Sequence, residues 1–121
     1  MKTIKKVINI NPEILHETEV LKIIQMRLMD VSSSTRESSL DLLWSSLTQI
    51  SEGSSQKMKI FQREFMKKYL PIIVERADDT SLGVRKRVVQ ILSYILQNST
   101  SSALCQSDII SVLIRKWDDA D

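Results

Sequence analysis

Apolar residues recur along the chain with the three- and four-residue spacing of amphipathic helices, and no segment shows the strict alternation of a half-buried strand. The clearest stretch covers residues 84–96, with apolar side chains at Val84, Val88, Ile91, Leu92 and Ile95. The same spacing predicts further helices over about 18–29, 35–50, 57–77 and 107–117, and the end of a helix within 1–10. Polar, turn-forming segments separate these stretches. We therefore predict an all-α fold.

Four residues refine this prediction. Pro71 lies inside the predicted helix 57–77 and should bend it or end its first segment. Ser107 is suited to cap the last helix, because its hydroxyl can accept a backbone N–H. Trp44 falls on an apolar face, as does Trp117, and both are predicted to lie in the core; an exposed anchor for a partner peptide is the alternative.

One short phrase occurs twice. Asp30 to Arg36 and Asp79 to Arg85 each begin with Asp, continue through a polar turn and reach Arg six positions later, and the second copy lies 49 positions after the first. The apolar residues behind the two arginines match in register, as the pairs Leu40/Val89, Leu42/Ile91, Leu43/Leu92 and Leu47/Leu96. A helical unit recurring at this distance is typical of HEAT-type repeats. Such repeats build binding surfaces and scaffolds.

The period predicts a HEAT-type α-solenoid of antiparallel helix pairs, with about two full repeats and a half repeat at each end. We expect residues 1–10 to end a preceding repeat, 12–50 and 57–98 to form the two repeats, and 105–121 to give the first helix of a following one. The end faces would then meet neighbouring repeats of the same chain, so we interpret the sequence as a segment of a longer solenoid.

Composition narrows the function classes. The 121 residues are 42% apolar and 26% charged, and the formal net charge of +2 is only mildly basic. A lone Cys105 excludes an internal disulfide, and with His16 as the one histidine a zinc site is not expected. No Gly-rich phosphate loop and no Ser-His-Asp or Cys-His arrangement is present, so we expect no catalysis and no cofactor. No apolar run is long enough to cross a membrane.

The repeated phrase suggests a structural role for its charged residues. We interpret Asp30, Arg36, Asp79 and Arg85 as a ladder, in which each Asp caps the second helix of its repeat and each Arg bridges to an Asp of the adjacent repeat. Contact of the two arginines with DNA is the alternative.

Five further basic residues are candidates for binding DNA or a partner: Lys86, Arg87, Lys59, Arg63 and Lys67. Lys86 and Arg87 follow the ladder arginine and oppose the dipole near a helix start, which suggests an external reason for their charge. The other three lie at i, i+4 and i+8 and form one stripe on a helix. The alternative for both groups is a solvated helix face. For Lys86 and Arg87, contact with an acidic surface of a partner is a further alternative. Phosphate contact would be non-specific and salt-sensitive.

The two repeats resemble those of one protein family. Arg27-Leu28-Met29-Asp30, with Arg36-Glu37 and Leu42-Leu43 behind it, resembles a repeat of the Nipped-B-like cohesin loading factors. A second repeat is similar in Glu75-Arg76, Asp79-Thr80 and the run from Val84 to Leu92, and Asn11-Pro12 with Leu15 resembles the Asp-Pro-x-x-Leu element that precedes these repeats. The resemblance covers most of residues 1–98. The sequence departs from the usual pattern of this family at four places. Trp44 stands in place of a small Gly, Thr35 in place of Val, Ser81 and Gly83 are exchanged, and the loop at 51–59 is longer.

The resemblance implies a function. Loaders of this family are HEAT-repeat hooks without an active site of their own, which bind cohesin and DNA, stimulate the cohesin ATPase and promote sister chromatid cohesion. It therefore implies cohesin subunits (the SMC ATPase heads and the kleisin) and non-specific double-stranded DNA as partners, and the nucleus as location. The alternative keeps the fold and changes the role, to a condensin-type subunit, a nuclear transport receptor or a phosphatase scaffold. An enzyme is a third hypothesis, with no motif in its support.

Overall fold

The computed structural model describes residues 14–15, 17–50, 55–98 and 103–115. These residues form helices and no strand, in the order α2 (Thr18–Leu28), α3 (Ser33–Ile50), α4 (Ser55–Glu75), the short 3-10 helix η2 (Arg76–Asp78), α5 (Leu82–Asn98) and α6 (Ala103–Arg115). The predicted all-α fold is confirmed. The predictions for residues 1–10, His16 and Trp117 lie outside the described residues.

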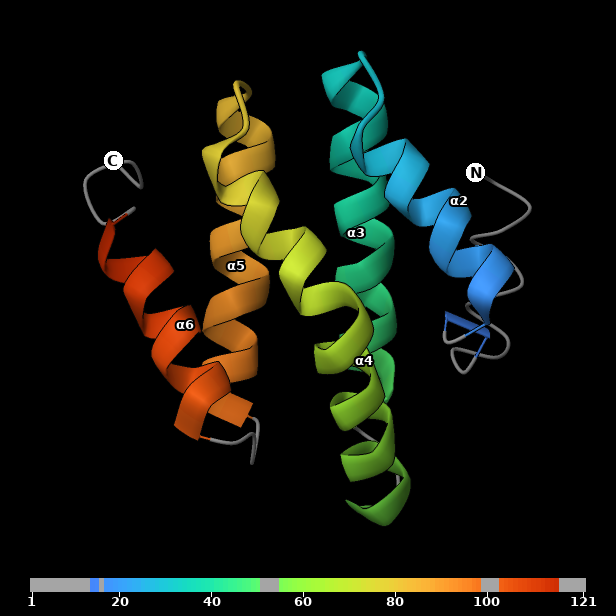
Figure 1. Ribbon diagram of the computed structural model, residues 1–121, viewed down its shortest axis with the longest axis vertical. Helices are drawn as coiled ribbons and strands as arrows, with labels where there is room; N and C mark the ends of the chain where they lie inside the picture. Colours follow the sequence, from blue (N-terminus) through green and yellow to red (C-terminus); the bar gives the residue numbers. More distant parts are fainter. Residues whose placement is uncertain (1–13, 16, 51–54, 99–102, 116–121) are drawn as a thin grey trace.

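The helices form two layers. Figure 1 shows α3 and α5 side by side and nearly parallel, with α4 crossing in front of them, α2 beside α3 and α6 beside α5. The chain reverses its direction from each α-helix to the next, so consecutive helices are antiparallel. The helix pairs are α2 with α3 and α4 with α5. The two pairs pack on each other mainly through their second helices, α3 and α5. This arrangement is an α-solenoid of helix pairs.

One continuous apolar core joins the layers. The five predicted core positions of α5 are all buried: Val84, Val88, Ile91, Leu92 and Ile95. On α4, Phe65 and Tyr69 are fully buried with ring centroids 5.3 Å apart. The Tyr69 hydroxyl donates a hydrogen bond to the carbonyl of Leu15, so its polar end is satisfied. This bond attaches the turn before α2 to the middle of α4.

Two buried serines on α3 were not foreseen. Ser39 and Ser46 have no exposed surface, and each hydroxyl donates a 2.9 Å hydrogen bond to the carbonyl four residues earlier. The polar atom is thereby satisfied within its own helix, and a small side chain fills a site of close helix packing. Trp44 is half-buried against the core, and its ring meets Tyr94 of α5 edge-on at 5.2 Å. The pair joins α3 to α5.

Pro71 bends α4, one of the two effects predicted for it: the helix continues to Glu75, and Figure 1 shows it changing direction in its second half. Other helix bounds differ from the prediction. Ser107 does not cap α6, because the helix begins at Ala103; Ala and Leu at its start are strong helix formers and add a turn. α3 and α5 each begin two residues earlier than predicted, since Ser32 and Ser81, and not the residues after them, precede the first helical turn.

Candidate interaction surfaces

A buried ion pair joins the two helix pairs. Arg36 lies in the first turn of α3, and Asp79 follows η2. The Nε and Nη2 atoms of Arg36 donate to Oδ2 and Oδ1 of Asp79, both at 2.9 Å, and the two side chains are only 10% and 3% exposed. A planar guanidinium held by both oxygens of a carboxylate has a fixed geometry, so this pair sets the orientation between the units.

The same arginine also binds the turn of its own unit. Its Nη1 atom donates to the carbonyl oxygens of Asp30 at 2.7 Å and of Val31 at 3.2 Å. Arg36 therefore donates to acceptors in two turns: its own, and that of Asp79, which lies 43 residues after it in the sequence. Removing it would take one donor from each of the two carbonyls and two from the buried carboxylate.

The two copies of the phrase have the same local geometry. Oδ1 of Asp30 accepts the N–H of Ser32 at 2.8 Å, and Oδ1 of Asp79 accepts the N–H of Ser81 at 2.9 Å. Each Asp thus orders the residue just before the second helix of its unit. Arg85 donates to the carbonyl of Asp79 at 2.8 Å, as Arg36 does to Asp30.

The surroundings of Asp79 shift its acidity. Burial by itself would raise the pKa of this carboxyl, but hydrogen bonds from Arg36 and from the N–H of Ser81, with the charges of Arg36 and Arg76, hold its pKa below the ordinary value of 3.8. Arg76 lies 3.6 Å from Oδ2 of Asp79, and its Nη1 also approaches the carbonyl at the end of α2, that of Leu28, at 3.4 Å. The folded state therefore favours the ionised form of Asp79.

Arg87 has an internal role that the sequence did not reveal. Its Nε donates to Asp41 at 2.9 Å and its Nη1 to Glu37 at 2.8 Å, so a residue of α5 bridges to two carboxylates of α3. The charge near the start of α5 thus has a partner within the chain, contrary to the external reason that its position suggested. The signal for it is Glu37 and Asp41 at i, i+4 on the facing helix.

Gly83 makes room for this bridge. A Cβ at this position would lie 2.0 Å from the Oε1 atom of Glu37, closer than any real contact. The glycine carbonyl also accepts a 3.0 Å hydrogen bond from Arg87. The exchange of Ser81 and Gly83 noted in the sequence therefore places the smallest residue where the Glu37 carboxylate approaches α5.

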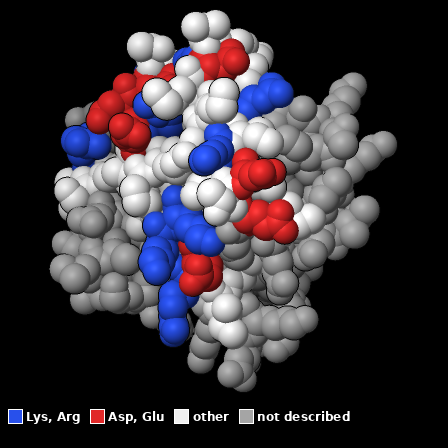
Figure 2. All heavy atoms as spheres, turned by 45° about the vertical axis from the view of Figure 1, so that its right-hand side comes forward, with Lys and Arg blue, Asp and Glu red and all other residues white. Residues whose placement is uncertain are grey.

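The other basic candidates are not brought together. Arg63 and Lys67 are exposed on α4, whereas Lys86 is exposed on α5 in the other layer. Within the described part of the chain these three side chains make no ion pair; the Lys59 side chain lies outside that part. Figure 2 shows a column of Lys and Arg side chains with an acidic side chain beside it. On α4, Lys68 pairs with Glu64 at 3.6 Å, so part of the positive charge of this helix is already balanced.

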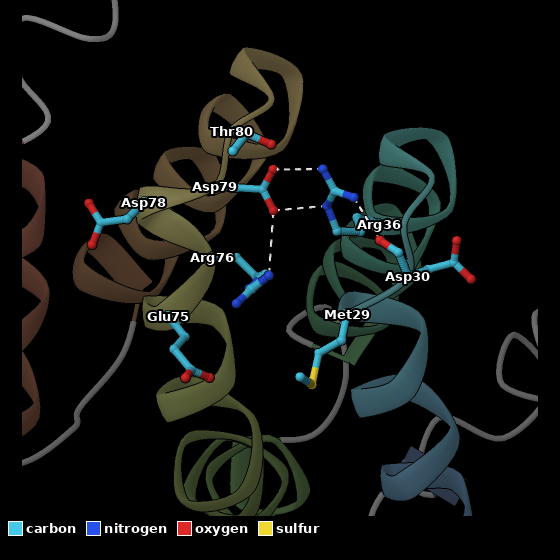
Figure 3. A pocket seen from close by; sticks show the side chains of 8 residues that line it. All are labelled: Met29, Asp30, Arg36, Glu75, Arg76, Asp78, Asp79 and Thr80. Carbon is cyan, nitrogen blue, oxygen red and sulfur yellow. Dashed lines mark hydrogen bonds and ion pairs between the residues drawn. The ribbon is translucent and has the colours of Figure 1, made fainter.

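A groove of about 290 Å³ opens at the junction between the units (Figure 3). Its lining is polar apart from Met29: Met29, Asp30, Arg36, Glu75, Arg76, Asp78, Asp79 and Thr80. Among the residues that the structure describes, no three His, Cys, Asp or Glu side chains are placed to hold a metal ion. None of the helices described is long and apolar enough to cross a membrane.

The fold and the inter-unit ion pair define the chain as a segment of a HEAT-repeat α-solenoid. Residues 2–43 match the family model described as a HEAT repeat associated with sister chromatid cohesion. Nipped-B-like protein A of Danio rerio and the Nipped-B-like protein of Homo sapiens are each 30% identical to the chain over 92 residues, 76% of this chain. The Nipped-B-like protein scc-2 of Caenorhabditis elegans is 24% identical over 121 residues, the whole chain.

The chain spans only 3% of the length of the two vertebrate relatives and 5% of the nematode one. No solved structure matches it. The predicted resemblance to the Nipped-B-like cohesin loaders is confirmed: the chain is a HEAT-repeat segment related to these proteins.

We predict that Arg36→Ala destabilises the chain by about 3 kcal/mol, because the buried Asp79 carboxylate loses its bidentate partner and keeps only Arg76 at 3.6 Å and the N–H of Ser81. Arg36→Lys should restore only part of the loss, since an ammonium cannot hold both carboxylate oxygens in the same plane. Urea unfolding followed by circular dichroism measures the change. Arg115→Ala is the matched control: its pair with Asp78 is more than half exposed, so it should cost no more than about 1 kcal/mol. Equal losses for the two alanine variants would contradict a central role for Arg36.

We also predict that acid selectively weakens the junction. Because the folded pKa of Asp79 is lowered, its contribution to stability is fully present above the unfolded value of 3.8 and is lost as the pH falls from there through the lower folded pKa. Unfolding free energies measured from neutral pH to below pH 3.8 should therefore fall more steeply in the native chain than in Asp79→Asn, which carries no titrating carboxyl at this site. Identical slopes would show that Asp79 does not contribute to this acid sensitivity.

Proposed function

We propose that the chain is a non-catalytic HEAT-repeat part of a cohesin loader that acts in sister chromatid cohesion in the nucleus. The observation that carries the proposal is the match of residues 2–43 to the cohesion-associated HEAT model, together with Nipped-B-like relatives along most of the chain. As units we propose the divisions 12–50 and 57–98, flanked by partial repeats at 1–10 and 105–121.

The geometry supports a positioning role. A bidentate Arg36–Asp79 pair and the Arg87 bridge fix α3 and α5 relative to each other at two places. A segment held in this way presents its exposed side chains at constant separations, which is what a scaffold needs to bind a large partner. In the complete loader we propose that such segments contact cohesin, at its SMC ATPase heads or its kleisin, and stimulate its ATPase, while the hydrolytic site belongs to the SMC partner.

The same segment offers a surface for DNA. Arg63 and Lys67 are exposed one turn apart on α4, and Lys59 continues the stripe in sequence. Figure 2 shows a column of basic side chains on the surface of the molecule. Lysine and arginine side chains of this kind bind phosphates without reading sequence. Lys86 is a second, separate candidate on α5. Arg87 would reach a phosphate only by releasing Glu37 and Asp41, so we rank it below the others.

We predict that Arg63→Glu with Lys67→Glu weakens binding of the chain to a fluorescently labelled DNA duplex. Two lost phosphate contacts should reduce the slope of log affinity against log salt by about two. Fluorescence anisotropy at several salt concentrations measures both quantities. Lys86→Glu alone should reduce the slope by about one if α5 also meets the duplex.

Lys22→Glu with Arg27→Glu is the matched control, because it changes the net charge equally but lies on α2. Thermal unfolding of each variant excludes misfolding. If the native chain does not bind, or if both double variants lose affinity equally, the α4 surface is not a DNA contact, and binding to purified cohesin subunits becomes the test of the loader assignment. Failure there would favour a HEAT scaffold of another kind.

We predict that the isolated chain hydrolyses ATP no faster than buffer, because a loader segment contributes no nucleotide site of its own. A phosphate-release assay checks this, with purified cohesin as the positive control. Turnover that scales with chain concentration and survives further purification would contradict the non-catalytic assignment.

A further inference from the structure

Three large apolar side chains are exposed within six residues at the end of α2. Met26 is 73% exposed and Met29 74% exposed, and Val31 in the following turn is 99% exposed. Met26 and Met29 are neighbours on the helix surface, since they lie three positions apart. Exposed apolar side chains gathered in one place mark an interaction surface more often than single ones do.

The second helix pair shows that the fold does not require these residues. Shifting by the repeat length of 49 positions aligns the buried residues of the two units, Ile24 with Ile73 and Leu28 with Ala77. The exposed positions differ in kind: Met26, Met29 and Val31 correspond to Glu75, Asp78 and Thr80. Polar side chains at these positions are therefore compatible with the fold. The apolar side chains of the first unit are not required for folding, which suggests that they serve binding.

One residue of the apolar set, Met29, and all three of the polar set line the same groove. Met29 lines the groove of about 290 Å³ from the α2 side, and Glu75, Asp78 and Thr80 line it from the end of α4 and from the turn after η2. Figure 3 shows the Met29 side chain pointing into the space between α2 and α4, with the Arg36–Asp79 pair above it. Met29 is therefore the one apolar residue of a groove that carries carboxylates on both sides.

The charges of the groove are unbalanced. Four carboxylates line it against two guanidinium groups. Both guanidinium groups, those of Arg36 and Arg76, are engaged by Asp79. Asp30 and Glu75 make no ion pair with any residue that the structure describes, so a negative charge remains on each side of the groove. This surplus favours a cationic occupant and disfavours nucleic acid.

We propose that this groove binds a segment of a partner protein in which an apolar side chain stands next to a lysine or arginine. The cation lies between Asp30 and Glu75, which line the groove. The apolar side chain packs on Met29 in the groove and extends over the exposed Met26 and Val31, its neighbours in the sequence. The stem of a lysine or arginine also packs on methionine while its head group stays with the carboxylates. The groove is separate from the basic residues of α4, so this binding does not depend on DNA contact.

The test uses the 121-residue chain with ¹³C-labelled methionine methyl groups and three synthetic peptides. Acetyl-Leu-Arg-Leu-Arg-amide should shift the Met26 and Met29 signals saturably. Acetyl-Gly-Arg-Gly-Arg-amide, which lacks the apolar side chains, should bind at least about tenfold more weakly. Acetyl-Leu-Glu-Leu-Glu-amide should leave the signals unchanged because its charge is repelled.

Two variants test where the peptide binds. Met29→Asn with Val31→Thr installs the polar character of the second unit, so the chain should fold while its affinity for the Leu-Arg peptide falls about tenfold. Ile114→Asn, which changes an equally exposed apolar residue on α6, should bind as the native chain does. A folded Met29→Asn, Val31→Thr variant with native affinity, or equal binding of the Leu-Glu peptide, overturns the proposal. So does dimerisation of the native chain through this face in analytical ultracentrifugation, which would make a second copy the occupant.

Discussion

The bidentate ion pair between Arg36 and Asp79 is the interaction on which the rest of the structure depends. It connects the first turn of α3 to the turn before α5, and it does so with both side chains largely removed from water. In such surroundings an unpaired carboxylate is costly, so the two units have one favourable relative orientation. The core packs α3 against α5 without specifying their register as tightly, because apolar contacts are not directional.

Three consecutive basic residues at the start of α5 have three different environments. Arg85 binds the carbonyl of Asp79 in its own turn, Lys86 is exposed, and Arg87 bridges to Glu37 and Asp41. Successive residues of an α-helix point about 100° apart, so three neighbours in the sequence face three different surroundings. A run of positive charge is therefore not one surface, and only part of it is available to a partner.

The two helix pairs share a buried pattern but differ in their exposed residues. Ile24 and Ile73 occupy equivalent buried positions, whereas Met29 and Asp78 occupy equivalent exposed ones. Packing constrains the first kind of position closely and the second hardly at all. A repeat architecture can therefore carry different surfaces on one scaffold: exposed Arg63 and Lys67 on α4, and an acidic groove with Met29 in its lining at the end of α2.

The sequence by itself determined the helical fold, the five buried positions of α5 and the equivalence of the two Asp-to-Arg phrases. Each of these follows from periodic spacing, which is a local property of the chain. Tertiary structure decided what sequence spacing cannot express: that Arg87 has carboxylate partners 46 and 50 residues away, that Gly83 leaves room for Glu37, and that Met29 faces the acidic end of α4. These depend on distances across the helix layers, which are fixed only when buried side chains and the Arg36–Asp79 pair bring the units together.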